Sequence, residues 1–347
     1  MKILLYSGHL NWIYKSGVGR ALRHQRRALE DAGVPYTTDP KDDYDIVHIN
    51  TIFPSSYLLA KRAHRKGKRV VYHAHSTQED FRNSFLFSNQ VAPLFKKWIS
   101  ACYRTGDLIL TPTPYSKSLL EGYGLDRPIV NVSNGIDLSY FDRAQADGAR
   151  FREKYGVKDG EKVIISVGLF LERKGILEFV DMAKRLPQYR FIWFGETDLK
   201  TVPAAVRRAV RTQLPNLTFA GYVESDALRD AYAGCDLYWF PTHEETEGIV
   251  LLEALAMRAP TLIRAIPIYE GWLRHGANIY KSSTQEGFQK LIGDIVEKRV
   301  PNLTGAAYEV AQERSIHEIG RQLRRQYESL LTQSQPQRLP VLGTSNL

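Results

Sequence analysis

Residues 241–253 read P-T-H-E-E-T-E-G-I-V-L-L-E and join a strand-like run to a helix-like run. The run before them, C-D-L-Y-W-F at 235–240, is typical of a buried strand. The run after Gly248, I-V-L-L-E-A-L-A-M at 249–257, has the pattern of a helix, and the glycine marks the turn between the two. This junction predicts a βα unit, the repeating element of an α/β fold.

Two carboxylates of this stretch, Glu245 and Glu253, lie on either side of the helix start. The free N–H groups of the first helical turn carry partial positive charge and suit an anionic phosphate. Glu245 would then meet a neutral polyol beside the phosphate, and Glu253 another pair of hydroxyls. A sugar nucleotide offers all three partners, whereas a solvated acidic loop and helix face is the alternative interpretation.

The rest of the chain repeats this alternation of strands and helices, which predicts two parallel sheets. At 347 residues the chain favours two domains. We expect a first domain at 1–157, a second at 158–315, a helix at 316–331 and a loose tail at 332–347. The expected strands are 2–6, 45–49, 69–75, 107–111 and 128–132 in the first domain, and 162–167, 190–194, 217–219, 236–240 and 260–263 in the second.

The composition indicates the cellular compartment of the protein and argues against some classes of protein. Two lone cysteines, Cys102 and Cys235, provide no disulfide framework and favour a reducing cytoplasm. The apolar run after Met1 is too brief for a signal peptide and fits a first buried strand. No segment approaches the roughly 20 apolar residues that a membrane-spanning helix needs.

Positive charge is concentrated in the first domain. Residues 1–140 hold 19 Lys and Arg against 12 Asp and Glu. No nucleic-acid recognition motif accompanies these cations, so we expect no nucleic-acid partner. The run L-F-K-K-W-I-S-A-C-Y-R at 94–104 alternates apolar and cationic residues, as in helices that lie on an anionic membrane surface. A surface helix that packs its apolar face on its own domain remains the alternative.

Four further motifs carry candidate chemistry. Gly17 and Gly19 open a helix in S-G-V-G-R, where glycine lets the backbone approach a phosphate, and a simple turn is the alternative interpretation. His73 and His75 end a strand and point to one face, although no third metal ligand is evident. The segment S-T-Q-E-D-F-R-N-S-F at 76–85 suits a sugar acceptor. Arg173 and Lys174 lie at the start of an expected helix, where their charges are repelled by the positive end of the helix dipole. They therefore require an anion or full solvation.

These motifs resemble the donor site of retaining glycosyltransferases of the GT-B type, family 4, which have two facing Rossmann-like domains. The resemblance rests on E-x7-E followed by E-A-L-A and on R-K-G at 173–175, with T-P-T-P-Y-S-K at 111–117 and S-N-G-I-D at 133–137 as supporting matches. It extends from Lys2 to about Leu331. It implies that the last helix crosses back onto the first domain.

The resemblance also implies roles for single residues. Glu245 positions the hydroxyls of the sugar, Glu253 holds the nucleotide ribose, and His75 orients the hexose from the opposite wall. Lys174 matches the diphosphate lysine of the family. Leu169 departs from the family, which has arginine there, and Arg173 is the candidate to supply that charge. The remaining implied donor contacts are Gly17, Gly19, Val223, Thr246, Gly248, Ile249 and Val250.

More narrowly, H-S-T-Q-E-D-F-R-N-S-F, F-I-W-F-G-E-T and E-E-T-E-G-I-V-L-L-E-A-L-A resemble bacterial glycosyl-diacylglycerol synthases. The resemblance implies transfer of a hexose, with retention of configuration, to monoglucosyl-diacylglycerol at the inner face of the cell membrane. UDP-galactose is the first candidate for the donor and UDP-glucose is the second. A D-x-D motif at a plausible metal position is missing, so we expect neither an essential metal nor another cofactor.

Three alternatives stay open at this point: a polyprenyl-linked or surface polysaccharide acceptor, a non-catalytic nucleotide-sugar or membrane-binding protein, and, least favoured, a dinucleotide oxidoreductase. The sequence also leaves the oligomeric state open.

Overall fold

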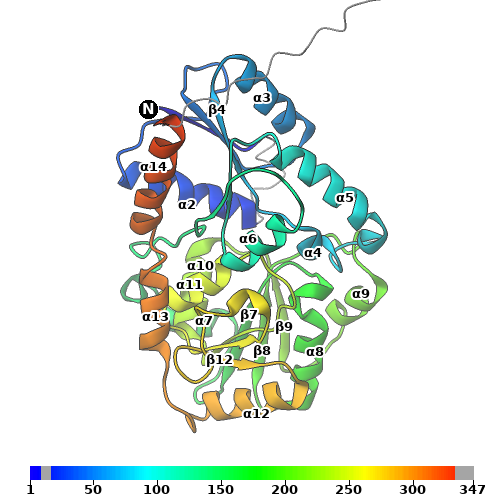
Figure 1. Ribbon diagram of the computed structural model, residues 1–347. Coiled ribbons are helices and arrows are strands. Elements are labelled where there is room, and N and C mark those ends of the chain that lie inside the picture. Colours follow the sequence, from blue (N-terminus) through cyan, green and yellow to red (C-terminus); the bar gives the residue numbers. More distant parts are fainter. Residues whose placement is uncertain (9–16, 333–347) are drawn as a thin grey trace, which may run out of the picture.

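Two parallel six-stranded sheets form the framework of the protein (Figure 1). The computed structural model describes residues 1–8 and 17–332. The first sheet has the order β2-β1-β3-β4-β5-β6 and all its pairings are parallel. Its strands are β1 (Ile3–Tyr6), β2 (Tyr36–Thr37), β3 (Ile46–Ile49), β4 (Arg69–His73), β5 (Leu108–Thr111) and β6 (Ile129–Asn131).

The second sheet repeats the design in the order β12-β11-β10-β7-β8-β9. Its strands are β7 (Val163–Val167), β8 (Arg190–Phe194), β9 (Leu217–Gly221), β10 (Leu237–Phe240), β11 (Thr261–Arg264) and β12 (Tyr280–Ser282). This arrangement confirms the predicted α/β fold with two Rossmann-like domains. The edge strands β2 and β12 were not predicted, because two or three residues carry too little alternation to be recognised.

Helices connect and cover the strands of both sheets. Around the first sheet lie α2 (Gly17–Asp31), α3 (Pro54–Arg65), α4 (Gln78–Phe81), α5 (Ser88–Tyr103) and α6 (Pro114–Glu121). The second part contains α7 (Gly148–Lys154), α8 (Ile176–Arg185), α9 (Ala204–Val210), α10 (Ser225–Gly234), α11 (Ile249–Ala256), α12 (Gln285–Val296) and α13 (Thr304–Gln312). Among the described helices, none is both long enough and apolar enough to cross a bilayer.

The last helix, α14 (Ile316–Thr332), returns to the first domain and packs against α2. Ile319 and Leu323 lie in one buried cluster with Ile3 and Val71 of the first sheet. The predicted crossing is therefore confirmed. Between α13 and α14 the chain leaves the helical conformation, and the backbone of Ile136 hydrogen-bonds there with the backbone of Arg314 and Ile316.

The expected domain limits at 157/158 and 315 stay predictions, and one packing detail bears on them. Phe141 and Phe151 precede the first limit in sequence but are buried in the core of the second sheet. The chain thus already packs into the core of the second sheet before β7 begins. The tail proposed at 332–347 lies, apart from Thr332, outside the described residues.

Gly320 tests how α14 holds to the first domain. A Cβ at this position would overlap the backbone carbonyl of Ala28 in α2. We expect Gly320→Ala to lower the free energy of unfolding by about 1–3 kcal/mol through overpacking. Chemical denaturation measures the loss. Gly305→Ala in α13 is the matched control, since its Cβ would meet nothing within 4 Å; an equal loss in both variants would contradict the packing account.

Candidate active site

A cleft of about 280 Å³ lies between the two domains. Its walls are built from segments that follow strands β1, β4, β6, β7, β8, β9 and β10, so the carboxyl ends of both sheets face it, as is usual for α/β ligand sites. The lining residues are Gly17, Val18, Arg20, His75, Ser76, Asp80, Asn134, Val167, Gly168, Leu169, Arg173, Lys174, Gly195, Glu196, Tyr222, Glu245, Thr246, Gly248, Ile249 and Val250.

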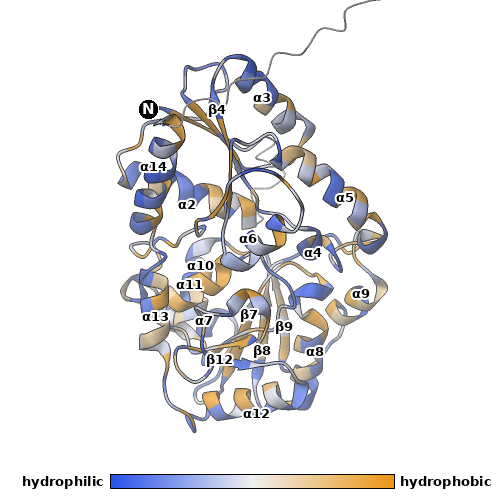
Figure 2. Ribbon diagram, viewed as in Figure 1, coloured by the Kyte–Doolittle hydropathy of each residue, from blue (hydrophilic) through white to orange (hydrophobic). Residues whose placement is uncertain are grey.

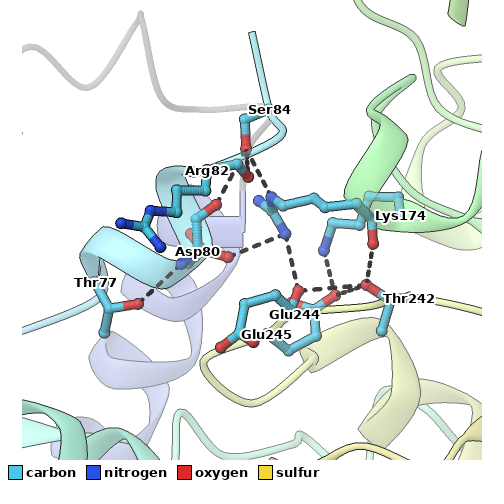
Figure 3. A network of polar contacts seen from close by, with 9 residues as sticks. Thr77, Asp80, Arg82, Ser84, Lys174, Thr242, Glu244 and Glu245 are labelled. Atoms are coloured by element: carbon cyan, nitrogen blue, oxygen red, sulfur yellow. Dashed lines mark hydrogen bonds and ion pairs between the residues drawn. The ribbon is translucent and has the colours of Figure 1, made fainter. Parts of the chain in front are cut away.

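Lys174 and Glu245 form an ion pair on the wall of the second domain (Figure 3). Thr242 donates its hydroxyl to the same carboxylate at 3.1 Å. Gly175 has a φ of 79° and lies so close to Pro241 that a side chain would collide with it. This contact brings the loop that carries Lys174 against the loop that carries Glu245. Burial lowers the pKa of Lys174, and the ion pair with Glu245 opposes that shift.

Arg173 connects the two walls of the cleft. Its guanidinium lies 3.0 Å from Asp80 and donates to the hydroxyl of Ser84 at 2.8 Å, both in the first domain. It also donates to the backbone carbonyl of Glu244 at 3.1 Å, in the second domain. Burial raises the pKa of Asp80, and the positive charge of Arg173 opposes that rise.

A second pair of charges crosses the cleft farther inside. Arg20 of α2 donates to both carboxylate oxygens of Glu253 of α11, at 2.6 and 2.8 Å. The hydroxyl of Tyr232 donates to the same carboxylate at 3.1 Å. Glu253 is only 1% exposed, so its charge depends on these partners. Arg20 thus pairs with the carboxylate that, according to the family resemblance, binds the ribose of the donor.

The first turn of α11 presents backbone to the cleft. Gly248 precedes the helix with a φ of 91°, and no side chain caps the turn. The cleft is lined here by Gly248, Ile249 and Val250. The backbone N–H groups at the start of a helix carry partial positive charge and favour an anion. Glu247 secures the loop, because its buried carboxylate accepts from the backbone and side chain of Asn134 at 2.9 Å.

His75 lies on the opposite wall as part of a buried polar network. Its Nε2 is 2.8 Å from the amide oxygen of Asn50, which can only accept, so Nε2 carries the proton and Nδ1 is the acceptor. Its ring stacks on His73 at a centroid distance of 4.1 Å, and the ring of His48 stacks on His73 in turn. Burial lowers the pKa of His75 to about 3, which keeps the ring neutral.

The structure thus brings together in one cleft most of the residues expected from the sequence. Gly17, His75, Arg173, Lys174, Glu245, Thr246, Gly248, Ile249 and Val250 line it. Gly19, Val223 and Glu253 are not among its described lining residues. Val223 packs against the core beside the lining residue Tyr222, and Glu253 is reached through Arg20.

Arg20, Asp80 and Asn134 were not singled out from the sequence, although each lies in a segment that was. Arg20 was counted only among the cations of residues 1–140, and its partner Glu253 stands 233 positions away in the chain. The two histidines considered as a metal pair gain His48 as a neighbour. Even so, residues 1–8 and 17–332 contain no cluster of three His, Cys, Asp or Glu side chains arranged to hold a metal ion.

Comparison with known proteins agrees with this architecture. The model of the family described as "Glycosyltransferase Family 4" matches residues 19–140, and that described as "Glycosyl transferases group 1" matches residues 147–314. The chain is 40% identical over 332 residues to a processive diacylglycerol alpha-glucosyltransferase of Acholeplasma laidlawii, covering 95% of this chain and 99% of the relative. An alpha-galactosylglucosyldiacylglycerol synthase of Streptococcus pneumoniae is 25% identical, with 73% and 70% covered.

Solved structures share the fold at lower identity. The Anabaena protein HepE, in complex with UDP and glucose, superposes with a TM-score of 0.72 at 17% identity, covering 95% of this chain and all of HepE. A sucrose-phosphate synthase from Thermosynechococcus elongatus gives 0.76 at 16% identity, covering 96% and 100%. Sequence and fold agree, and the chain belongs to the GT-B glycosyltransferases of the group 1 and family 4 type.

Proposed function

We propose that the protein transfers a hexose, with retention of configuration, from a UDP-hexose to monoglucosyl-diacylglycerol. The observation that carries the proposal is the cleft lined by three cations, Arg20, Arg173 and Lys174, which pair with the carboxylates of Glu253, Asp80 and Glu245 in that order. The sequence put galactose ahead of glucose as the donor sugar. We now put glucose first, because the relative of 40% identity is named a glucosyltransferase.

Donor binding requires the paired charges of the cleft to change partners. The ribose hydroxyls of the donor would replace Arg20 at Glu253, which frees the guanidinium for the diphosphate. Lys174, Arg173 and the N–H groups at the start of α11 would surround the same diphosphate and stabilise the negative charge that develops on it. Exchange of one anion for another keeps the buried cations compensated throughout.

Transfer then needs positioning more than it needs a protein nucleophile. Glu245 would hold the hexose hydroxyls, and the neutral His75 would accept one further hydroxyl through Nδ1. The hydroxyl of the acceptor would attack the anomeric carbon on the face that UDP leaves. A bond from the acceptor oxygen to that carbon forms as the carbon–phosphate oxygen bond breaks, and the departing phosphate takes the acceptor proton. No metal enters these steps.

The acceptor requires the protein to work at a membrane surface. The basic first domain, rich in Lys and Arg, fits an anionic lipid layer by charge complementarity. Two free, buried cysteines agree with a reducing compartment. We therefore place the protein at the cytoplasmic face of the membrane, bound peripherally.

A transfer assay tests this proposal directly. Purified protein is mixed with anionic vesicles that contain monoglucosyl-diacylglycerol, a chelator, and either UDP-glucose or UDP-galactose. Mass spectrometry and glycosidase digestion identify the lipid product. We expect an α-linked dihexosyl lipid from one donor. Donor hydrolysis without a lipid product would favour a polyprenyl-linked or polysaccharide acceptor, and UDP binding without any turnover would favour a non-catalytic protein.

Glu245→Gln tests the proposed sugar contact. The amide keeps the size of the side chain but loses the charge that pairs with Lys174, so we expect kcat/KM to fall by roughly a hundredfold. Because the variant leaves the buried Lys174 without its carboxylate partner, its thermal unfolding temperature should fall, and turnover is compared at a temperature at which circular dichroism shows the variant folded. Glu286→Gln, on the exposed face of α12, is the control. Near-normal turnover by the Glu245 variant would remove this residue from the site.

Lys174→Gln tests whether this lysine binds the diphosphate and not the rest of the nucleotide. Loss of a buried cation that faces phosphate should weaken UDP binding by roughly tenfold or more, because charge-assisted hydrogen bonds are lost. Uridine carries no phosphate, so its affinity should stay near that of the wild type. Calorimetric titration of both ligands measures the difference. Equal losses for UDP and uridine would show that the lysine acts on the structure of the cleft and not on the phosphate.

A further inference from the structure

Exposed apolar side chains gather at one place on the first domain. The described residues have eight large apolar side chains that are exposed, and five of them lie between positions 85 and 94. We call these five the apolar tip: Phe85, Leu86, Phe87, Val91 and Leu94. Phe87 is 71% exposed and Leu94 is 65% exposed, although both are residues that folding normally buries.

The tip has the geometry of one continuous face. Val91 and Leu94 are three positions apart in the first turns of α5, so they lie on the same side of the helix, and Phe87 is the N-cap residue directly before it. Ala92 and Ile99 on the other side are buried in the domain. Figure 2 shows hydrophobic and hydrophilic stretches along α5, whose start lies near α4 and α9. The helix therefore has a second apolar face that no part of the described chain covers.

Charge around the tip indicates what covers it. Residues 81–106 contain the four cations Arg82, Lys96, Lys97 and Arg104 and no Asp or Glu. A second copy of the chain, docked face to face through this segment, would set its Lys and Arg side chains against one another, and residues 81–106 supply no Asp or Glu to pair with them. An anionic lipid layer instead offers hydrocarbon for the apolar side chains and phosphate for the cations.

The tip is also attached to both walls of the cleft. Ser84, directly before it, accepts the hydrogen bond from Arg173, and Asp80 pairs with the same guanidinium. The backbone N–H of Leu86 donates to the carbonyl of Thr201 in the second domain at 3.0 Å. A surface that receives the tip therefore comes to the edge of the cleft where Asp80 lies.

We propose that the apolar tip inserts into an anionic lipid surface and holds the cleft against it, so that a lipid acceptor enters along the wall that carries Asp80. This inference rests on the proposed function and deepens it, because it assigns the membrane contact to a defined surface. The contact includes the start of α5 and the segment before it, ahead of the run 94–104 whose sequence suggested a membrane helix.

Co-sedimentation with vesicles tests the tip. The full chain, its double variant Phe87→Ser/Leu94→Ser and the control Leu58→Ser are mixed with vesicles of phosphatidylcholine and phosphatidylglycerol, without donor. Leu58 is a matched control because it is 51% exposed on α3, outside the tip. We expect the double variant to lose roughly tenfold or more in vesicle partition, since two side chains no longer enter hydrocarbon. The control should bind as the wild type does.

UDP titration of the same proteins keeps this test separate from that of the donor site. We expect the double variant to bind UDP with wild-type affinity and to lose transfer to the vesicle-borne acceptor. Wild-type vesicle binding by the double variant would overturn the inference. So would self-association of the wild type, without vesicles, that the double variant lacks. Failure of the wild type to bind UDP would instead defeat the proposed function and leave the vesicle result standing.

Discussion

Ion pairing across the interdomain cleft is the constraint on which the rest of the structure depends. Arg20 and Glu253 come from different domains, and Arg173 joins Asp80 of the first domain to the loop of Glu244 in the second. These side chains are buried or nearly so, and a buried charge without a partner is costly. These pairs therefore stabilise the observed arrangement of the two sheets, and the donor site is made of the same charges.

The pairing of cations with carboxylates explains how a site for a dianion can stay folded without its ligand. Each cation of the cleft already has a carboxylate partner, so the diphosphate enters by exchange and meets no uncompensated charge. Glu247, by contrast, accepts its hydrogen bonds from the neutral Ser133 and Asn134, contacts that a donor need not displace. The structure thus combines contacts across the cleft that can exchange with others that stay.

The fold could be predicted from the sequence because its signals are local. The strand Arg190–Phe194 and the helix start at Ile249 are marked by apolar runs with turns beside them, and both agree with the structure. The β12 strand at Tyr280–Ser282 could not be recognised, because three residues hold no period. Arg20 was missed for a different reason: only the folded chain shows that one arginine of a basic helix faces Glu253. The exposed face of Phe87 and Leu94 is likewise a property of packing, since their spacing also suits a buried helix.

Partner exchange at Glu253 is the central claim of this account, and a crystal structure of the protein with UDP tests it most directly. The account predicts that the carboxylate of Glu253 binds the ribose hydroxyls and that Arg20 has moved to the diphosphate beside Lys174. Bound UDP with the Arg20–Glu253 pair intact and the ribose elsewhere would contradict it.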